Sequence, residues 1–514
     1  MIVVVAIIAV VVLLGPAIVR ALIRRRLRGY RVIWEPGGAR RDPPPDATVA
    51  VIGGGLAGIA AATTLAEAGL KVTIFEAQPY LGGKLGAWPA TLPSGETIAV
   101  SHGFHAFFRH YYNLDAYLVR LGLRQRFVAV DDYLILEASG RTVSFRGLST
   151  TPALNLLALA WRGVYRFSDV IFGPARDLMG VFLEYDEATT FARYDRYTLQ
   201  DFDRIAQLPA GLKLSFRTFA RAFFADADRI SLAEVIKSFH FYYLGHDRGL
   251  LYDHPVEDYE AALWAPIRAH LARLGVEVLL STPVDALGEG LVVNGRAFDH
   301  VVLAADAAAT RKILSHFPDH APALAPGQRY AVLRVFADKD VRAGLPIFVV
   351  TDRVRLLDSV TLFHRFERES MEQVARHGGS VLELHCYAVP DDLPDEQVRG
   401  ALLYELVRFF PELGGLSLRG EVLHIRSDFS AFHAGMHARR PTTVSGIPGV
   451  HFAGDWVKLP FPAMLLEAAF ASGLLAANDV LDALGLPRTR IDCVPPRGLM
   501  AGMPEPPARK KLLP

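Results

Sequence analysis

Residues 47 to 77, "ATVAVIGGGLAGIAAATTLAEAGLKVTIFEA", constrain the fold more than any other part of the chain. The pattern predicts an apolar strand, a glycine turn, an alanine-rich helix, and a second strand that ends at Glu76. The turn contains Gly53, Gly55 and Gly58. In such a turn the glycines let the backbone approach a pyrophosphate, the helix N-terminus stabilises its charge, and the acid accepts a hydrogen bond from a ribose hydroxyl. The sequence therefore predicts a dinucleotide-binding unit of Rossmann type in an α/β fold.

The first residues of the chain are apolar. The run from 2 to 23 is interrupted only by Gly15, Pro16 and Arg20, and as a helix it would be about 33 Å long, enough to cross a bilayer core. It lacks the basic start and the small-residue cleavage site of a signal peptide. We therefore expect an uncleaved transmembrane anchor, with the arginines between 24 and 28 placing the rest of the protein on the cytoplasmic side of a bacterial inner membrane. The alternative is a buried N-terminal helix, which would have no polar face.

Length, charge and cysteine content limit the remaining possibilities. A chain of 514 residues favours two domains. Lys and Arg number 55 against 54 Asp and Glu, so no overall field favours nucleic acid. Cys386 and Cys493 form no CxxC pair, which fits a reducing compartment without structural zinc. The histidines at 102, 105 and 110 lack the i,i+4 helical spacing of a metal site, so no metal is expected.

Two further motifs carry a resemblance to a known family. The stretch "EAQPYLGGKLGAW" places Gly83 and Lys84 shortly after Glu76. The stretch "GVHFAGDWVKLPFPAMLLEAAFASGLLAANDVL" places Gly454 and Asp455 between a predicted strand and a helix. Both resemble motifs of the flavin amine oxidase and carotenoid desaturase superfamily, and the resemblance spans most of residues 48 to 482. It implies FAD as the cofactor, with Lys84 near the flavin and Asp455 at its ribityl or phosphate part.

The same resemblance assigns two more positions near the cofactor. Val284, in "HLARLGVEVLLSTPVDAL", takes the adenine-side position of the family. Glu467 takes the place of the family's glutamate at the start of the last helix, with one residue inserted before it. The N-terminus of that helix would stabilise negative charge on a reduced flavin.

The stretch "SHGFHAFFRHYYNL", residues 101 to 114, resembles the Gly-Leu-His-x-Phe-Phe run of carotenoid desaturases. It departs from the family at 101 and 102, where Ser and His stand in the region of a family acid. The candidates for catalysis are His105, Arg109 and Glu467. For His105 two interpretations stay open, a proton-transfer role or a structural histidine bonded to backbone beside the flavin. The residues expected to line the substrate pocket are Phe104, Phe107, Phe108, Tyr111 and Phe461.

More aromatic residues, between 216 and 243, fit either a helical core or the lining of a tunnel. Together with an anchor and a flavin they favour a tunnel for a long polyene. The motifs look most like those of the ring-modifying carotenoid desaturases. We therefore expect a membrane-associated, FAD-dependent oxidoreductase that converts a β-type ring to an aromatic end group by hydride abstraction and a 1,2-methyl shift. Its expected partners are a lipid bilayer, an apolar isoprenoid substrate and a quinone as candidate electron acceptor.

Three alternatives remain at this point: an acyclic carotene desaturase, isomerase or squalene-pathway flavoprotein; a flavin amine oxidase; and a prenyl-binding protein without flavin chemistry. The expected domain plan is a mixed sheet-and-helix substrate domain beside the FAD-binding domain. Its ranges are the anchor at 2–23, a linker at 24–46, the FAD-binding domain at 47–130, 250–310 and 420–485, the substrate domain at 131–249 and 311–419, and a tail at 486–514.

Overall fold

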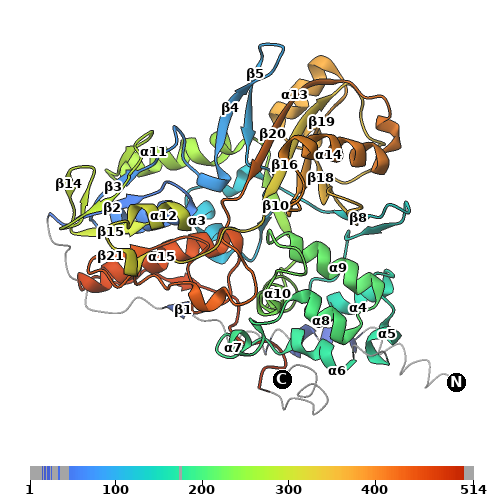
Figure 1. Cartoon of the computed structure of the whole chain (residues 1–514), viewed down its shortest axis with the longest axis horizontal. Helices are drawn as coiled ribbons and strands as arrows, with labels where there is room; N and C mark the ends of the chain where they lie inside the picture. The colour runs from blue at the N-terminus through green and yellow to red at the C-terminus, as the bar shows by residue number, and fades with distance from the viewer. Residues whose placement is uncertain are drawn as a thin grey trace.

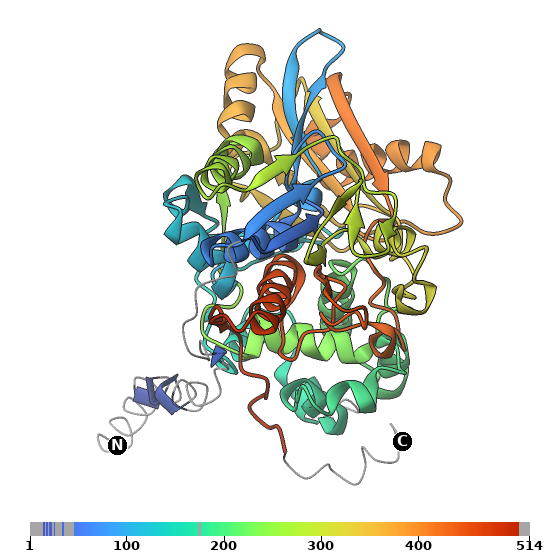
Figure 2. The same ribbon diagram turned by 90° about the vertical axis from the view of Figure 1, so that its left-hand side faces the viewer.

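The computed structural model describes residues 14–15, 17–18, 20–22, 25, 33–34, 46–172 and 176–502. They form three parts around a common centre (Figure 1): an α/β unit on the left, a larger sheet at the upper right and a helical region at the lower right. Figure 2, turned by 90°, shows the same order, with the larger sheet above and the helices below. The predicted domain boundaries stay a prediction.

The α/β unit is built on a parallel sheet with strand order β11-β3-β2-β15-β21. Its strands are β2 (Thr48–Ile52), β3 (Lys71–Phe75), β11 (Glu277–Leu279), β15 (His300–Leu303) and β21 (Val450–Phe452). Helix α2 (Leu56–Glu67) joins β2 to β3, as the sequence predicts, and packs against α15 (Leu465–Ala483). A Cβ at Gly473 of α15 would lie 2.1 Å from the carbonyl oxygen of Ala57. The two helices can therefore approach this closely only because that position is glycine.

The larger sheet has seven strands in the order β20-β16-β19-β18-β17-β8-β9, and all neighbours are antiparallel except β17 and β8. Its strands are β8 (Leu134–Leu136), β9 (Thr142–Ser144), β16 (Tyr330–Ala337), β17 (Phe348–Thr351), β18 (Ser359–Leu362), β19 (Ser380–Cys386) and β20 (Leu418–Arg426). Helix α14 (Asp395–Phe409) buries Leu402 and Leu406 with Leu333 and Leu384 of the sheet. Helix α13 (Arg368–His377) packs nearby against β19.

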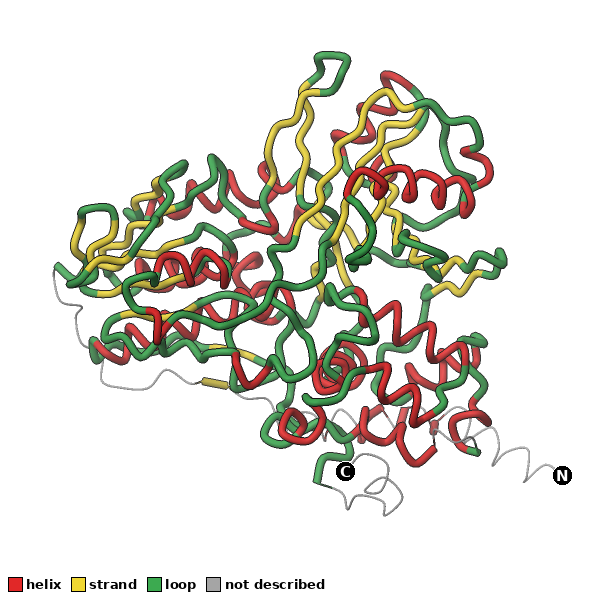
Figure 3. The backbone as a smooth tube through the Cα atoms, viewed as in Figure 1, coloured by secondary structure: helices red, strands yellow, loops and turns green. Residues whose placement is uncertain are grey.

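The helical region consists of short helices (Figure 3). They are α4 (Leu154–Trp161), α5 (Phe167–Ile171), α6 (Arg176–Met179), α7 (Thr190–Tyr194), α8 (Leu199–Ala206), α9 (Ala210–Arg221) and α10 (Leu232–Phe239). A π-helical turn, η4 (His240–Leu244), continues α10. Phe182 stacks on Phe216 with ring centroids 4.6 Å apart. Part of the aromatic cluster expected between 216 and 243 is therefore helical core.

Smaller elements connect these parts. They are β1 (Ile33–Trp34) paired with β22 (Ile491–Asp492), the hairpin β4 (Ala87–Thr91) and β5 (Thr97–Ser101), the sheet of β6 (Phe107–Phe108), β10 (Tyr252–Pro255) and β7 (Phe127–Ala129), the strands β12 (Leu287–Gly288), β13 (Val292–Val293) and β14 (Arg296–Ala297), and the helices α3 (Tyr112–Arg120), α11 (Ala265–Arg273) and α12 (Ala307–Ile313). Strand β6 and the start of α3 hold part of the aromatic run of residues 101 to 114, and β6 pairs with β10.

The predicted architecture is corrected in one respect, the transmembrane helix expected over 2–23. Most of that range lies outside the described residues. Within the described part of the chain, no helix is both long enough and apolar enough to cross a membrane. Apolar length alone supported that expectation. A spanning segment must also be one continuous helix of about 20 residues, because each backbone group has to be hydrogen-bonded within the segment.

Candidate active site

The glycine turn between β2 and α2 forms one end of a cavity of about 750 Å³. Gly53 has φ of 111°, and a Cβ there would lie 2.7 Å from the carbonyl oxygen of Ala304. A Cβ at Gly58 would lie 1.9 Å from the carbonyl oxygen of Gly53. Both positions therefore require glycine. Gly53 and Gly55 line the cavity, so the backbone and the N-terminus of α2 are open to an anionic ligand.

Glu76 lies at the end of β3 beside this turn and also lines the cavity. Its Oε2 accepts from the backbone N–H of Gly54 at 2.6 Å, and its Oε1 accepts from that of Gln78 at 2.7 Å. Burial raises the pKa of Glu76, and the two backbone donors oppose that shift. Each carboxylate oxygen has a further lone pair. Glu76 can therefore accept a hydrogen bond from a ribose, as the sequence predicts.

The second glycine motif and the last motif meet at the same place. Lys84 Nζ lies 3.2 Å from Asp455 Oδ2, and the two residues are 371 positions apart in the chain. Lys84 also lies 4.0 Å from the centre of the Phe429 ring. Gly83 packs against the glycine turn, since a Cβ there would lie 3.3 Å from the Cα of Gly55. Lys84 and Asp455 therefore supply one positive and one negative group to the cavity wall.

Gly454 and Val284 complete the set expected near the cofactor, and both line the cavity. Gly454 has φ of 143°, and its N–H donates to Ser472 Oγ on α15 at 2.7 Å. Val284 lies after β11, on the side of the sheet edge that also presents Ala304. The cofactor-binding residues expected from the sequence therefore surround the carboxyl edge of the parallel sheet, except Gly58, which shapes the turn from behind.

The other end of the cavity is aromatic. Tyr242 and Tyr243 come from the π-helical turn η4, a local distortion that is frequent at functional sites. Phe108 lies with its ring centroid 4.8 Å from that of Tyr242, and the hydroxyls of Tyr111 and Tyr242 are 2.9 Å apart. The aromatic lining residues of this end are Phe104, Phe108, Tyr111, Tyr133, Phe145, Phe223, Phe224, Tyr242, Tyr243, Tyr252 and Phe348. One continuous cavity thus joins a nucleotide cradle to an apolar chamber.

His105 lines this cavity. Its Nδ1 is 2.7 Å from the carbonyl oxygen of Gly103, and its backbone N–H donates to the hydroxyl of Tyr259 at 3.0 Å. Because a carbonyl oxygen can only accept, Nδ1 carries the proton and Nε2 keeps its lone pair. Burial lowers the pKa of His105 to about 4, so the ring is neutral at ordinary pH.

Four other expected site residues lie away from the cavity lining. Arg109 forms a two-pronged ion pair with Asp253. Glu467 accepts from the backbone N–H of Asn113 at 2.9 Å and from that of Leu114 at 3.2 Å, at the start of α3. The other two are Phe107, which packs against Phe127, and Phe461, which lines a separate small pocket. The catalytic roles considered for Arg109 and Glu467 stay predictions, and their contacts are those of residues that position neighbouring segments.

A buried charged network that none of the sequence motifs predicts lies next to the segment of Phe104 and His105. Glu383 Oε1 accepts from the backbone N–H of Phe104 at 2.7 Å, and Glu383 Oε2 accepts from Arg334 Nε at 2.9 Å. His385 Nε2 lies 2.9 Å from the same carboxylate. Burial alone would raise the pKa of Glu383, but Arg334 and His385 lower it to about 2. The sequence does contain a signal of this network, because Arg334 and Glu383 each interrupt an apolar strand, "YAVLRVFA" and "SVLELHC".

A glycine cradle, a buried carboxylate and an apolar chamber line one cavity, an arrangement that suits an enzyme with a bound cofactor. The chain belongs to the family of flavin containing amine oxidoreductases, whose model matches residues 56–481. It is a flavin-dependent oxidoreductase. The backbone cradle and the Lys84–Asp455 pair fit a bound flavin cofactor, because they offer donors to a phosphate and a cation beside an acceptor.

Comparison with known proteins gives two similar relatives. The "Carotenoid phi-ring synthase" of Streptomyces griseus is 36% identical over 498 residues, covering 93% of this chain and 96% of that protein. The "Carotenoid phi-ring synthase" of Chlorobaculum tepidum is 26% identical over 592 residues, covering 88% and 91%.

Solved structures show the same fold. A putrescine oxidase bound to putrescine has a TM-score of 0.61 at 17% identity and covers 85% of this chain and 99% of its own. An oxidoreductase from Methanosarcina mazei has a TM-score of 0.60 at 15% identity, with 85% and 100% covered. At these identities the likeness concerns the fold alone.

Proposed function

We propose that this protein is an FAD-dependent oxidoreductase that converts the β-type ring of a carotenoid into an aromatic end group. The observation that carries the proposal is the continuous cavity of about 750 Å³, with a nucleotide cradle at one end and an aromatic chamber at the other. A ring inserted into the chamber would lie beside the cofactor, while the polyene stays among apolar side chains. The two relatives named as carotenoid phi-ring synthases support the substrate class.

FAD is the proposed form of the flavin because the cradle offers sites for an adenosine half. Glu76 suits the ribose of that half, and Val284, which lines the same cavity, suits its adenine. The turn at Gly53 to Gly55 would hold the pyrophosphate at the N-terminus of α2. A bound flavin would accept one hydride, and so two electrons, at a time. Each ring loses two hydrides, and we propose a quinone as the acceptor that would reoxidise the flavin between the two removals.

The chemistry also requires a base. Turning a trimethylcyclohexenyl ring into a trimethylphenyl ring removes two hydrides and two protons and moves one methyl group. The quaternary ring carbon carries no hydrogen, so a cation beside it is relieved by migration of a methyl from that carbon. Each proton must then leave from a neighbouring carbon to an acceptor in the apolar chamber.

His105 is the proposed acceptor. Its Nε2 has a free lone pair because Nδ1 donates to Gly103, and its low pKa keeps the ring neutral. The buried carboxylate of Glu383 fixes the adjoining backbone at Phe104. The proton accepted at Nε2 comes from a ring carbon, and the electron pair of the broken C–H bond enters the new ring double bond. General-base roles of this kind contribute about 10²- to 10⁴-fold to a rate.

Expression in a host that accumulates β-carotene tests the proposal. We expect carotenoids with aromatic end groups, each converted ring having lost four hydrogens, and purified protein with the absorption bands of a flavin. His105→Asn keeps a donor for Gly103 but removes Nε2, so it should retain flavin and lose aromatic product. Accumulation of more desaturated acyclic carotenes only would exclude the ring reaction.

The proposed partner that supplies the substrate is a lipid bilayer, since carotenoids dissolve in membranes. Two large apolar side chains of the helical region support this contact, Trp161 at 93% exposed and Phe172 at 84% exposed. Aromatic side chains of this kind are favoured at membrane interfaces. Replacing both by Ala should reduce co-flotation with liposomes, whereas Tyr404→Ala on exposed α14 should leave flotation unchanged.

A further inference from the structure

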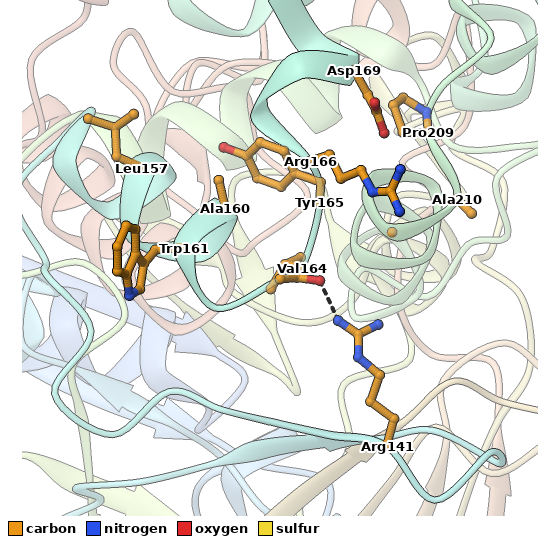
Figure 4. A pocket seen from close by; sticks show the side chains of 12 residues that line it. Arg141, Leu157, Ala160, Trp161, Val164, Tyr165, Arg166, Asp169, Pro209 and Ala210 are labelled. Atoms are coloured by element: carbon orange, nitrogen blue, oxygen red, sulfur yellow. Dashed lines mark hydrogen bonds between the residues drawn. The ribbon is translucent and has the colours of Figure 1, made fainter.

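A second pocket lies on the outer side of α4 (Figure 4). Its volume is about 680 Å³, and most of its lining is apolar. Leu157, Ala160 and Trp161 face it from α4, and Tyr165 and Arg166 face it from the segment that follows. None of the sequence motifs points to this pocket, and neither the cofactor site nor His105 uses it.

The outer pocket meets the active-site cavity at one residue. Val164 lines both, whereas Leu159, on the other face of α4, lines only the inner cavity. The backbone around Val164 is closely packed, because a Cβ at Gly211 would lie 1.8 Å from its carbonyl oxygen. Arg141 holds the other side by donating to the carbonyl oxygen of Gly163. Among the described lining residues, Val164 is therefore the one that the two spaces share, so they adjoin at this position.

The size of the inner cavity explains why a second space is needed. A pocket for one drug-sized ligand has a volume of about 300 to 1,000 Å³. The inner cavity, at about 750 Å³, falls within that range, yet it has to hold a dinucleotide and a substrate ring. A long polyene whose ring lies beside the cofactor must therefore continue beyond the chamber.

We propose that the outer pocket binds the distal part of the polyene, with the chain passing Val164. This inference rests on the proposed function and adds a subsite to it. The apolar wall formed by Leu157 and Ala160 suits a hydrocarbon chain, and the exposed ring of Trp161 suits stacking on conjugated double bonds. The charged lining residues are Arg141, Arg166 and Asp169, and the Arg141 guanidinium donates to the carbonyl oxygen of Gly163.

Ala160→Trp tests the subsite by filling it. We expect the Kd of the flavin-loaded protein for β-carotene, measured by visible absorption in detergent, to rise about tenfold or more. Binding of β-ionone should stay within about twofold, because this compound has the same ring and a side chain too short to pass Val164. Ala116→Trp, on the exposed face of α3, is the matched control and should change neither value.

Leu157→Asp is a second variant in case Ala160→Trp misfolds. Leu157 is 47% exposed, so an aspartate is tolerated there while it repels a hydrocarbon chain. Unchanged β-carotene affinity in a folded variant, or an equal loss for β-carotene and β-ionone, would overturn the subsite. Wild-type protein that binds β-carotene through the outer pocket but makes no aromatic product would instead overturn the proposed reaction and leave the subsite standing.

Discussion

The two ends of the active-site cavity are built in different ways. At the nucleotide end, backbone at Gly53 and Gly55 faces the ligand, and the few side chains that matter are charged, such as Glu76 and Lys84. At the substrate end, much of the wall consists of aromatic rings from β6, the segment after α9, η4, β10 and β17. A nucleotide site that relies on backbone tolerates no side chain, whereas a wall made of side chains can change shape by substitution. The two ends should therefore respond differently to mutation.

The largest effect is expected from Gly53→Ala. The added Cβ would lie 2.7 Å from Ala304 O in a backbone with φ of 111°, and strain plus overpacking costs about 2 to 6 kcal/mol. We expect loss of bound flavin, measured by absorption, and a lower Tm. Gly95→Ala is the control, because its φ is 85° but nothing lies within 4 Å of the added Cβ. It should keep its flavin; equal loss in both variants would mean that backbone strain alone acts.

The next effect concerns Glu467, which joins α15 of the nucleotide end to α3 near the substrate end. Burial raises its pKa from 4.5 to about 8, although Asn113 and Leu114 donate to it. A carboxyl with a raised folded-state pKa stabilises the fold below pH 4.5, and this stability is lost as pH rises toward 8, at about 1.4 kcal/mol per pH unit. Relative to Glu467→Gln, the wild type should therefore lose unfolding free energy between pH 5 and 8.

Chemical denaturation at several pH values measures this difference. The control is Glu372→Gln on the exposed face of α13, whose free energy of unfolding should run parallel to that of the wild type. Parallel curves for Glu467→Gln as well would contradict the assignment and would indicate that the N–H groups at the start of α3 keep the carboxylate ionised.

A smaller effect is expected at the substrate end from Phe108→Ala. The ring contacts those of Tyr111, Tyr242 and Tyr252, and its loss would loosen the placement of the substrate ring. We expect kcat/KM to fall about 10- to 100-fold, since small displacements from the transfer geometry are costly, with flavin content unchanged. Tyr404→Ala on α14 should leave both quantities as they are. Loss of flavin in Phe108→Ala would show that the two ends are not separable.

The smallest effect is expected from Lys84→Met, which removes the charge but keeps much of the aliphatic stem. Asp455 then loses a partner at 3.2 Å. Both side chains are partly exposed, so the pair contributes about 1 kcal/mol or less, and the Kd for flavin should rise by about fivefold at most. Fluorescence titration of the apoprotein measures it, and added salt should shrink the difference between variant and wild type.

The local motifs of the sequence predict the backbone of the nucleotide end correctly. The strand, turn, helix and acid of residues 47 to 77 form as predicted, because glycine conformation, helix start and strand alternation depend on neighbours in the chain. The apolar length of 2–23 shows the limit of such reasoning. It met the length of a bilayer, yet no spanning helix is found among the described residues.

The sequence predicts less well which side chains line the cavity. Phe107 and Phe108 are neighbours in β6, so they point to opposite faces, and only Phe108 lines the cavity. Phe216 and Phe223 lie seven positions apart and both belong to the core, yet only Phe223 also lines the cavity. The network of Arg334 and Glu383 showed only as single charges in apolar strands. Which face of a strand or helix is buried depends on the elements that pack against it.

The sequence by itself determined the nucleotide cradle, the kind of cofactor it suits and the family, because glycine turns and their flanking elements are set by residues a few positions apart. The tertiary structure alone decided that Lys84 meets Asp455 across 371 positions, that His105 lines the cavity with its Nδ1 bonded to Gly103, and that Val164 lines two spaces. These depend on long-range packing of segments whose order in the chain says little about their distance in space, and no local pattern encodes a cavity.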